Sequence, residues 1–118
     1  MLFDFDEFKR VAERVFPEEC GYTLEEALTV FQYFFQKYEE FTGKPHPPIK
    51  ENQIVRIALA MPYFDLQRKG EPAVDVFPEY YPDIINQYFQ TPFQNCNYRI
   101  NHFFSGRIRE LRYCELLC

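Results

Sequence analysis

Residues 23–45 read TLEEALTVFQYFFQKYEEFTGKP and contain the clearest helical pattern of the chain. Thr23 and Glu26 have the T-x-x-E spacing of a capping box, which satisfies backbone amides at a helix N-terminus. Gly43 stands where a left-handed C-cap would end the helix. Between these signals, apolar side chains recur every three or four residues: Leu24, Leu28, Phe31, Phe35 and Tyr38, with Ala27, Phe34 and Phe41 beside them. We predict a helix from 24 to 42, with an apolar stripe wide enough to pack against two or more other helices.

The same periodicity predicts further helices on both sides of this segment. Asp4 with Glu7 resembles a capping box, and Pro17 stops the pattern that follows it. Ser105-Gly106 interrupts the last pattern, which predicts a kink, a close helix crossing or a break into two short helices. Three additional helices are expected over residues 4–16, over residues 50–61, and from Tyr81-Pro82-Asp83 to just before Pro92. The last helix is expected to begin at Asn97 as its cap residue and to carry Ile100, Phe104, Ile108 and Leu111 on one face.

Two segments do not follow this periodicity. Residues 44–49 read KPHPPI, and three prolines in six residues predict an extended linker. Residues 62–80 include the turn-forming sequence RKGEP and form the least regular part of the chain. We therefore predict an all-α fold, a compact bundle of about five helices with an irregular segment at 62–80.

The composition predicts that this bundle is one domain with an aromatic core. The chain has 118 residues, which is enough for a single core and too short for two ordinary domains. Hydrophobic residues make up 47% of it, including 14 Phe and 9 Tyr, although the mean hydropathy is only −0.42. Disordered chains are poor in aromatic residues, so we predict a single helical domain over residues 1–118.

Charge and targeting signals narrow the class of protein. The net charge is −5, and residues 1–42 hold ten acidic side chains against four basic ones. The first residues are acidic where a signal peptide would be basic, and no apolar stretch is long enough to span a bilayer. We predict a cytoplasmic protein without a membrane span, in which the four cysteines are free thiols.

The sequence contains no convincing catalytic or metal-binding motif. Cys114 and Cys118 are spaced for one helical face, but no C-x-x-C pair accompanies them, and His46 and His102 have no neighbouring ligand. His102 and Ser105 are three residues apart, yet nothing in the sequence supplies a third catalytic group or an oxyanion hole. No glycine-rich phosphate loop can be written. We therefore predict no metal, no cofactor and no enzymatic activity.

The C-terminal segment concentrates arginine and aromatic residues that are candidate binding residues. They are Arg99, Arg107, Arg109 and Arg112, with Tyr98 and Tyr113 among them. Such residues can contact phosphates and stack on bases, so a nucleic-acid-associated module is one alternative function. Salt bridges to Glu110, Glu115 or a partner subunit are the structural alternative. The acidic residues 1–42 allow a third possibility, an acidic mimic of nucleic acid, although basic residues interrupt them.

Aromatic side chains also exceed what one buried helical stripe needs. Tyr33 falls off the main apolar face of the predicted helix at 24–42, and tyrosine is a frequent interface residue because it buries area at low entropic cost. Our leading hypothesis is therefore a noncatalytic accessory domain that binds a protein partner or a second copy of itself. Binding to phosphates would weaken steeply as salt rises, whereas an apolar protein interface would hardly respond.

One further observation concerns the segment Asn97–Arg109, which reads NYRINHFFSGRIR. Together with residues 84–89, IINQYF, it resembles the C-terminal part of small uncharacterised helical proteins of Gram-positive mobile elements. The resemblance covers about a third of the chain and implies bacterial or mobile-element biology. It carries no catalytic motif and no assigned activity.

Overall fold

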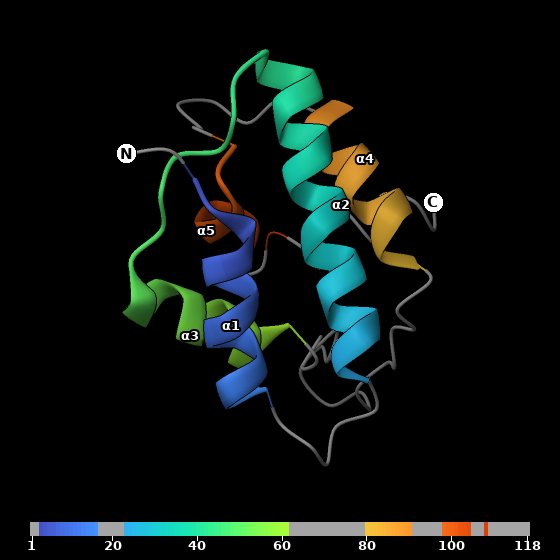
Figure 1. Cartoon of the computed structure of the whole chain (residues 1–118). Coiled ribbons are helices and arrows are strands. Elements are labelled where there is room, and N and C mark those ends of the chain that lie inside the picture. The colour runs from blue at the N-terminus through green and yellow to red at the C-terminus, as the bar shows by residue number, and fades with distance from the viewer. Residues whose placement is uncertain (1–2, 17–22, 62–79, 91–97, 105–107, 109–118) are drawn as a thin grey trace.

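The computed structural model describes residues 3–16, 23–61, 80–90, 98–104 and 108 (Figure 1). Its helices are α1 (Phe5–Val15), α2 (Leu24–Thr42), α3 (Glu51–Ala60), α4 (Tyr81–Gln90) and α5 (Ile100–Phe103). Within these ranges no strand occurs, so the predicted all-α bundle of about five helices is confirmed. The predicted irregular segment lies outside the described residues, apart from Tyr80.

Helix α2 has the bounds and the caps that its sequence predicts. The Thr23 N–H donates to Glu26 Oε1 at 2.9 Å, and the Glu26 N–H donates to Thr23 Oγ1 at 3.1 Å, which completes the capping box. At the other end, Gly43 has φ +76°, and its N–H donates to the Glu39 carbonyl at 2.8 Å. Glycine adopts this left-handed conformation without the steric cost of a Cβ, which explains why the helix ends there.

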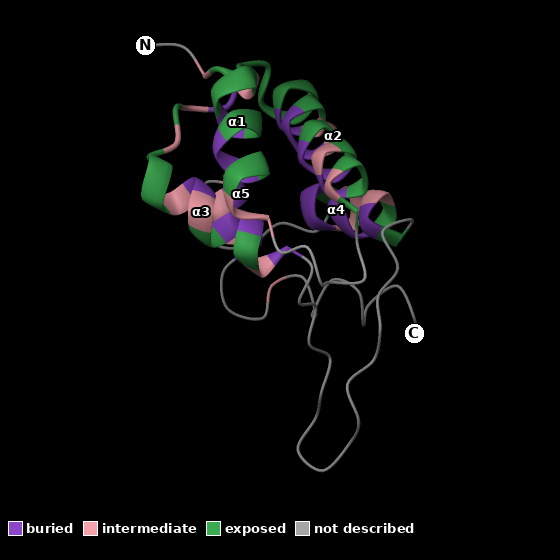
Figure 2. Cartoon of the chain, turned by 60° about the horizontal axis from the view of Figure 1, so that its bottom comes forward, coloured by how far each residue is buried: buried purple, intermediate pink, exposed green. Residues whose placement is uncertain are grey.

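The helices pack in two main pairs. Helix α1 packs against α3, and α2 runs beside α4 (Figure 1). An ion pair between Arg14 of α1 and Glu51 of α3 joins the first pair. Buried residues lie on the helix faces that are turned toward the other helices, while exposed residues lie on the outer faces (Figure 2). None of the helices in the described ranges is long and apolar enough to cross a bilayer.

The core is built mainly from aromatic rings, as the composition predicts. Phe34 of α2 lies among rings of two other helices, with centroid distances of 6.1 Å to Tyr88, 5.2 Å to Phe89 and 5.2 Å to Phe103. Such offset and tilted ring pairs are favourable beyond the apolar area that they bury. Helix α2 therefore contacts several helices, as its wide stripe predicts. The largest fully buried side chains are Tyr81, Tyr88, Phe8, Phe31, Phe34, Phe103, Met61, Ile84, Ile85 and Ile100.

The prediction for the last helix was wrong at its start. Helix α5 begins at Ile100, and its N-cap residue is Arg99, which has extended backbone, rather than Asn97. Arg99 makes no side-chain capping bond. The Ile100 N–H instead donates to Nε2 of His46 at 3.0 Å, across 54 positions of sequence. The helix ends at Phe103, so Ile100 and Phe104 of the predicted apolar face do not both lie within it. Ser105-Gly106 and Leu111 lie outside the described residues.

His46 belongs to the proline-rich linker at 44–49, in which the structure has neither helix nor strand. Its side chain is only 3% exposed and is surrounded by the rings of Phe3, Phe35 and Tyr38 at centroid distances of 4.7–5.6 Å. Because Nε2 accepts the Ile100 N–H, the proton of the neutral ring sits on Nδ1 and is donated to the Pro47 carbonyl at 2.8 Å. Burial lowers the pKa of His46 to about 4. His46 therefore acts as a buried, neutral cap that fixes α5.

Candidate functional site

Three aromatic rings meet where α2 and α4 end. The Phe41 ring lies 5.4 Å from the Phe89 ring and 5.1 Å from the Tyr98 ring, and the rings of Phe89 and Tyr98 stack at 6.2 Å. We call Phe41, Phe89 and Tyr98 the Phe41 surface. Each comes from a different segment: the last turn of α2, the last turn of α4, and the residues just before α5.

The Phe41 side chain is the most exposed large apolar group among the described residues. It is 51% exposed, whereas Phe34 and Phe31, about two and three turns earlier on the same helix, are fully buried. Phe89 beneath it is 8% exposed. The Phe41 surface therefore consists of one accessible ring resting on rings that are packed into the core.

Tyr98 reaches this position through an unusual backbone conformation. Its φ is +58°, the only positive φ of a non-glycine residue in the described part of the chain. A left-handed conformation costs a residue with a bulky side chain about 1–3 kcal/mol, so the surrounding contacts must hold it there. Those contacts are the rings of Phe41, Phe89 and Tyr88, the last at 5.7 Å. The observed strain accordingly coincides with the exposed aromatic cluster.

Polar side chains border an open groove of about 410 Å³ beside the rings. Lys37 Nζ lies 3.2 Å from Glu40 Oε2, and this hydrogen-bonded pair raises the pKa of Lys37 and lowers the pKa of Glu40. Lys37 also lies over the Tyr33 ring, 5.5 Å from its centroid. The Tyr33 hydroxyl donates to Asn86 Oδ1 of α4 at 2.8 Å. The border of the groove is thus already ordered by contacts within the chain.

The structure brings together three of the predicted binding residues and says nothing of the others. Tyr98 forms part of the Phe41 surface, and Arg99 follows it with an exposed side chain. Tyr33 is half-buried at the border of the groove, and its hydroxyl is bonded to Asn86. The remaining candidates, Arg107, Arg109, Arg112 and Tyr113, lie outside the described residues.

Sequence reasoning did not single out Phe41 or Phe89 as site residues. The sequence places Phe41 beside the apolar stripe of α2, and its position in the last turn of the helix was a usable signal. Phe89 gave no such signal, because its role depends on which ring comes to lie on it. An aromatic residue in the last turn of a helix, off the main stripe, is the pattern that could have pointed to this surface.

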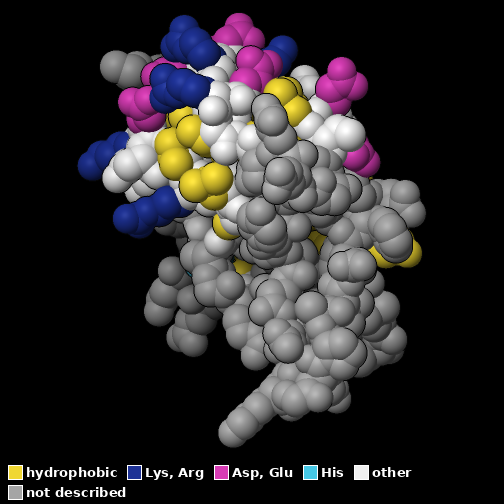
Figure 3. All heavy atoms as spheres, turned by 90° about the horizontal axis from the view of Figure 1, so that it is seen from below, with side chains coloured by type: hydrophobic (Ala, Val, Ile, Leu, Met, Phe, Trp, Pro, Cys, Tyr) yellow, Lys and Arg dark blue, Asp and Glu magenta, His cyan; other side chains and the backbone are white. Residues whose placement is uncertain are grey.

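Other candidate chemistry finds limited support in the described residues. His102 Nδ1 lies 2.6 Å from the Tyr88 hydroxyl, while Ser105, its proposed catalytic neighbour, is outside the described ranges. No group of three or more His, Cys, Asp or Glu side chains that could hold a metal ion occurs among the residues described. Where the described residues lie on the face seen from below, basic and acidic side chains are intermixed (Figure 3).

Comparison with protein families, with curated proteins and with solved structures finds no match to this chain. The resemblance of residues 97–109 to proteins of mobile elements therefore stays a prediction, as do the cytoplasmic location and the absence of catalysis.

Proposed function

We propose that this chain is a noncatalytic protein-interaction domain and that it binds its partner through the Phe41 surface. The observation that carries the proposal is the position of Phe41, whose ring is half exposed although it packs against Phe89 and Tyr98. A ring that is ordered by its neighbours and still accessible loses little conformational freedom when a partner covers it.

The border of the groove supports a protein partner rather than a polyanion. Lys37 and Glu40 form an ion pair with each other, so the pair adds no net charge next to the rings. Specific protein interfaces combine a buried aromatic centre with a polar rim, which is the arrangement found here. We expect the partner to place an apolar side chain in the groove. A second copy of this chain is one such partner.

The nucleic-acid alternative retains one supporting observation, the exposed Arg99 next to Tyr98. Its partner would be a phosphate backbone, and its affinity would fall steeply as salt rises because counterions are released on binding. An acidic mimic would also lose affinity with salt, but it would bind a basic protein and not an oligonucleotide. Salt dependence and oligonucleotide competition therefore separate the three functions.

The experiment introduces the photo-crosslinking residue benzoylphenylalanine at position 41 of the full chain. The matched control carries it at Leu59 of α3, which is 43% exposed and lies outside the Phe41 surface. We expect irradiation in the producing cells to link position 41, and not position 59, to one protein or to a second copy. The purified partner should then bind the unmodified chain with an affinity that hardly changes with salt.

Two results would contradict the proposal. One is that positions 41 and 59 capture the same proteins, which would make contact at Phe41 nonspecific. The other is a steeply salt-dependent affinity together with competition by a mixed oligonucleotide pool, which would favour the nucleic-acid module.

A further inference from the structure

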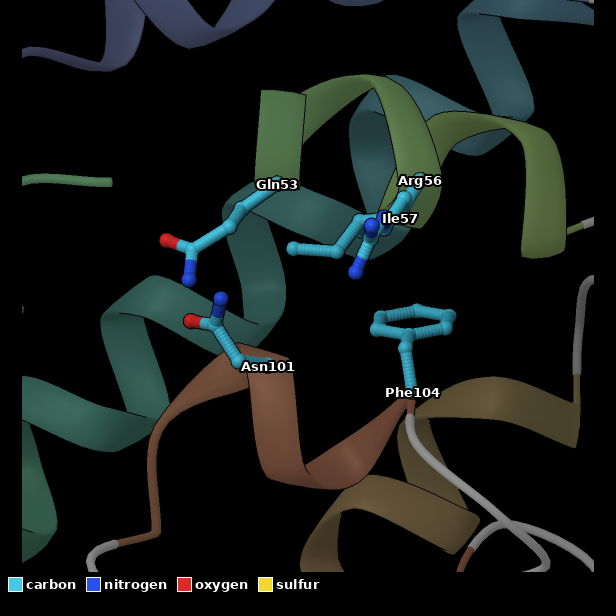
Figure 4. A pocket seen from close by; sticks show the side chains of 5 residues that line it. All are labelled: Gln53, Arg56, Ile57, Asn101 and Phe104. Atoms are coloured by element: carbon cyan, nitrogen blue, oxygen red, sulfur yellow. The ribbon is translucent and has the colours of Figure 1, made fainter. Parts of the chain in front are cut away.

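A second hollow, separate from the Phe41 surface, lies between α3 and α5. Its volume is about 270 Å³, and it is lined by Gln53, Arg56 and Ile57 of α3 and by Asn101 and Phe104 at α5 (Figure 4). The carboxamides of Gln53 and Asn101 face each other, and the Arg56 side chain extends toward the Phe104 ring (Figure 4). Since drug-sized ligands occupy pockets of about 300–1,000 Å³, this hollow suits a smaller molecule or one terminal group of a larger one.

The polar groups of this hollow have unused hydrogen-bonding capacity. Arg56 is exposed and forms no ion pair in the part of the chain that the structure describes; the nearby acid of α3, Glu51, pairs with Arg14 of α1. Over the same described ranges, the Asn101 side chain makes no hydrogen bond. Gln53 accepts only a long bond, 3.4 Å, from the Lys50 N–H, which leaves its amide protons available.

The apolar side of the hollow is held in place before any ligand binds. Ile57 and Phe104 are 4% and 8% exposed. The Phe104 ring lies 5.8 Å from Phe31 and 6.3 Å from Tyr81, so two core rings fix it. The bond from Ile100 to His46 fixes the start of α5, one residue before Asn101. A ligand would therefore meet a formed wall rather than one that must be ordered on binding.

We infer that this hollow is a binding site for a carboxylate attached to a small flat or apolar group. Among the described residues that line it, Arg56 is the one with a charged side chain, and guanidinium recognises carboxylate with two parallel N–H···O bonds. The carboxamides can donate to the outer lone pairs of the same group. Ile57 and the Phe104 ring supply an apolar wall for the attached group. The carboxylate can belong to a free small molecule or to the C-terminus of a peptide.

The test titrates the full chain, labelled with nitrogen-15, with benzoate and with its neutral analogue benzamide, and follows side-chain N–H signals by NMR. We expect benzoate to shift the signals of Arg56 Nε and of the Gln53 and Asn101 amides, with a dissociation constant on the order of millimolar. Because Arg56 is exposed, its ion pair is worth no more than about a fivefold gain in affinity. Benzamide should therefore bind the natural chain about two- to fivefold more weakly than benzoate does, and benzoate should bind Arg56→Gln more weakly by the same factor.

The matched control is Arg10→Gln, which removes the same charge from an exposed position of α1 and should bind benzoate as the natural chain does. A short peptide ending in phenylalanine, with a free or an amidated C-terminus, distinguishes the two sources of carboxylate. Tighter binding of the free peptide than of benzoate would assign the site to peptide C-termini, and the reverse would assign it to small molecules.

The inference is overturned if benzoate and benzamide bind equally, or if Arg56→Gln and Arg10→Gln have the same effect. It is also overturned if inorganic phosphate binds more tightly than benzoate, because the site would then select phosphate. Since the hollow shares no residue with the Phe41 surface, Phe41→Ser should leave benzoate binding unchanged, and failure of one proposal does not affect the other.

Discussion

The buried cap formed by His46 predicts that the protein loses stability as the pH falls from 7 to 4. In the folded chain Nε2 of His46 must stay unprotonated to accept the Ile100 N–H. A protonated ring would place a second donor against that N–H, inside a cage of Phe3, Phe35 and Tyr38. The positive charge of Arg99 also opposes protonation of His46. The acidic side chain of Glu39, from α2, lines an open hollow that His46 also lines.

The sign and size of the effect follow from the two pKa values. The ordinary pKa of histidine is 6.5, and the pKa of His46 in the folded chain is about 4. Between these values the unfolded chain binds a proton that the folded chain does not, so stability is complete above pH 6.5 and is lost as the pH falls toward 4. The difference corresponds to about 3 kcal/mol of unfolding free energy, most of which is lost by pH 4.

The assay is urea unfolding followed by far-ultraviolet circular dichroism at a series of pH values from 8 to 4. Carboxylates also titrate near the lower end, so His46→Gln serves as the reference: its side-chain oxygen can accept the Ile100 N–H, and it does not titrate. We expect the unfolding free energy of the natural chain to fall by about 3 kcal/mol more than that of His46→Gln. Parallel pH profiles for the two proteins, or a His46 pKa near 6.5 by NMR, would refute the reasoning.

Three further predictions concern the packing of the core, the N-terminal cap of α2 and one hydrogen bond between helices, and each is tested by chemical unfolding. Phe34→Ala should lower the unfolding free energy by about 3–5 kcal/mol, because it empties a site between three helices. Phe41→Ala on the same helix should lower it by less than about 1 kcal/mol. Equal losses for the two variants would contradict the difference in burial. Thr23→Ala should cost about 1 kcal/mol by removing the capping box, whereas Thr29→Ala, inside the helix, should be neutral or stabilising. Tyr33→Phe should cost about 1 kcal/mol because Asn86 loses its donor, and an unchanged unfolding midpoint would argue against that hydrogen bond.

The helices that the sequence predicts well are those whose ends depend on nearby residues. Thr23, Glu26 and Gly43 act within a few positions of the helix ends that they define, so the bounds of α2 could be read directly. The start of α5 could not, because its first amide is capped by His46, which is 54 positions away and reaches it only through the tertiary fold. The periodicity of residues 97–111 indicated apolar faces correctly at Ile100 and Phe104 but could not show where the backbone leaves the helix.

The candidate site was less predictable than the fold, for a similar reason. Tyr33 is a candidate because it falls off the apolar stripe, and Tyr98 is a candidate because it lies among the C-terminal arginines; both lie at or beside the exposed cluster. Whether Phe41 stays exposed depends on where α4 ends and on the left-handed backbone of Tyr98, and neither is encoded near Phe41. Hydrophobic periodicity distinguishes faces of a helix, but it does not show which part of a face the neighbouring helices leave uncovered.

The central claim is that Phe41 is the contact through which this domain binds a protein, and the most direct test is one ratio of affinities. The protein crosslinked at position 41 is purified, and its binding to Phe41→Ser and to Leu59→Ser is measured at low and at high salt. Truncation of a central aromatic anchor costs about 2 kcal/mol or more of binding free energy, so we predict at least about thirtyfold weaker binding for Phe41→Ser, at both salt concentrations, and an unchanged affinity for Leu59→Ser. Equal affinities of the two variants would contradict the account.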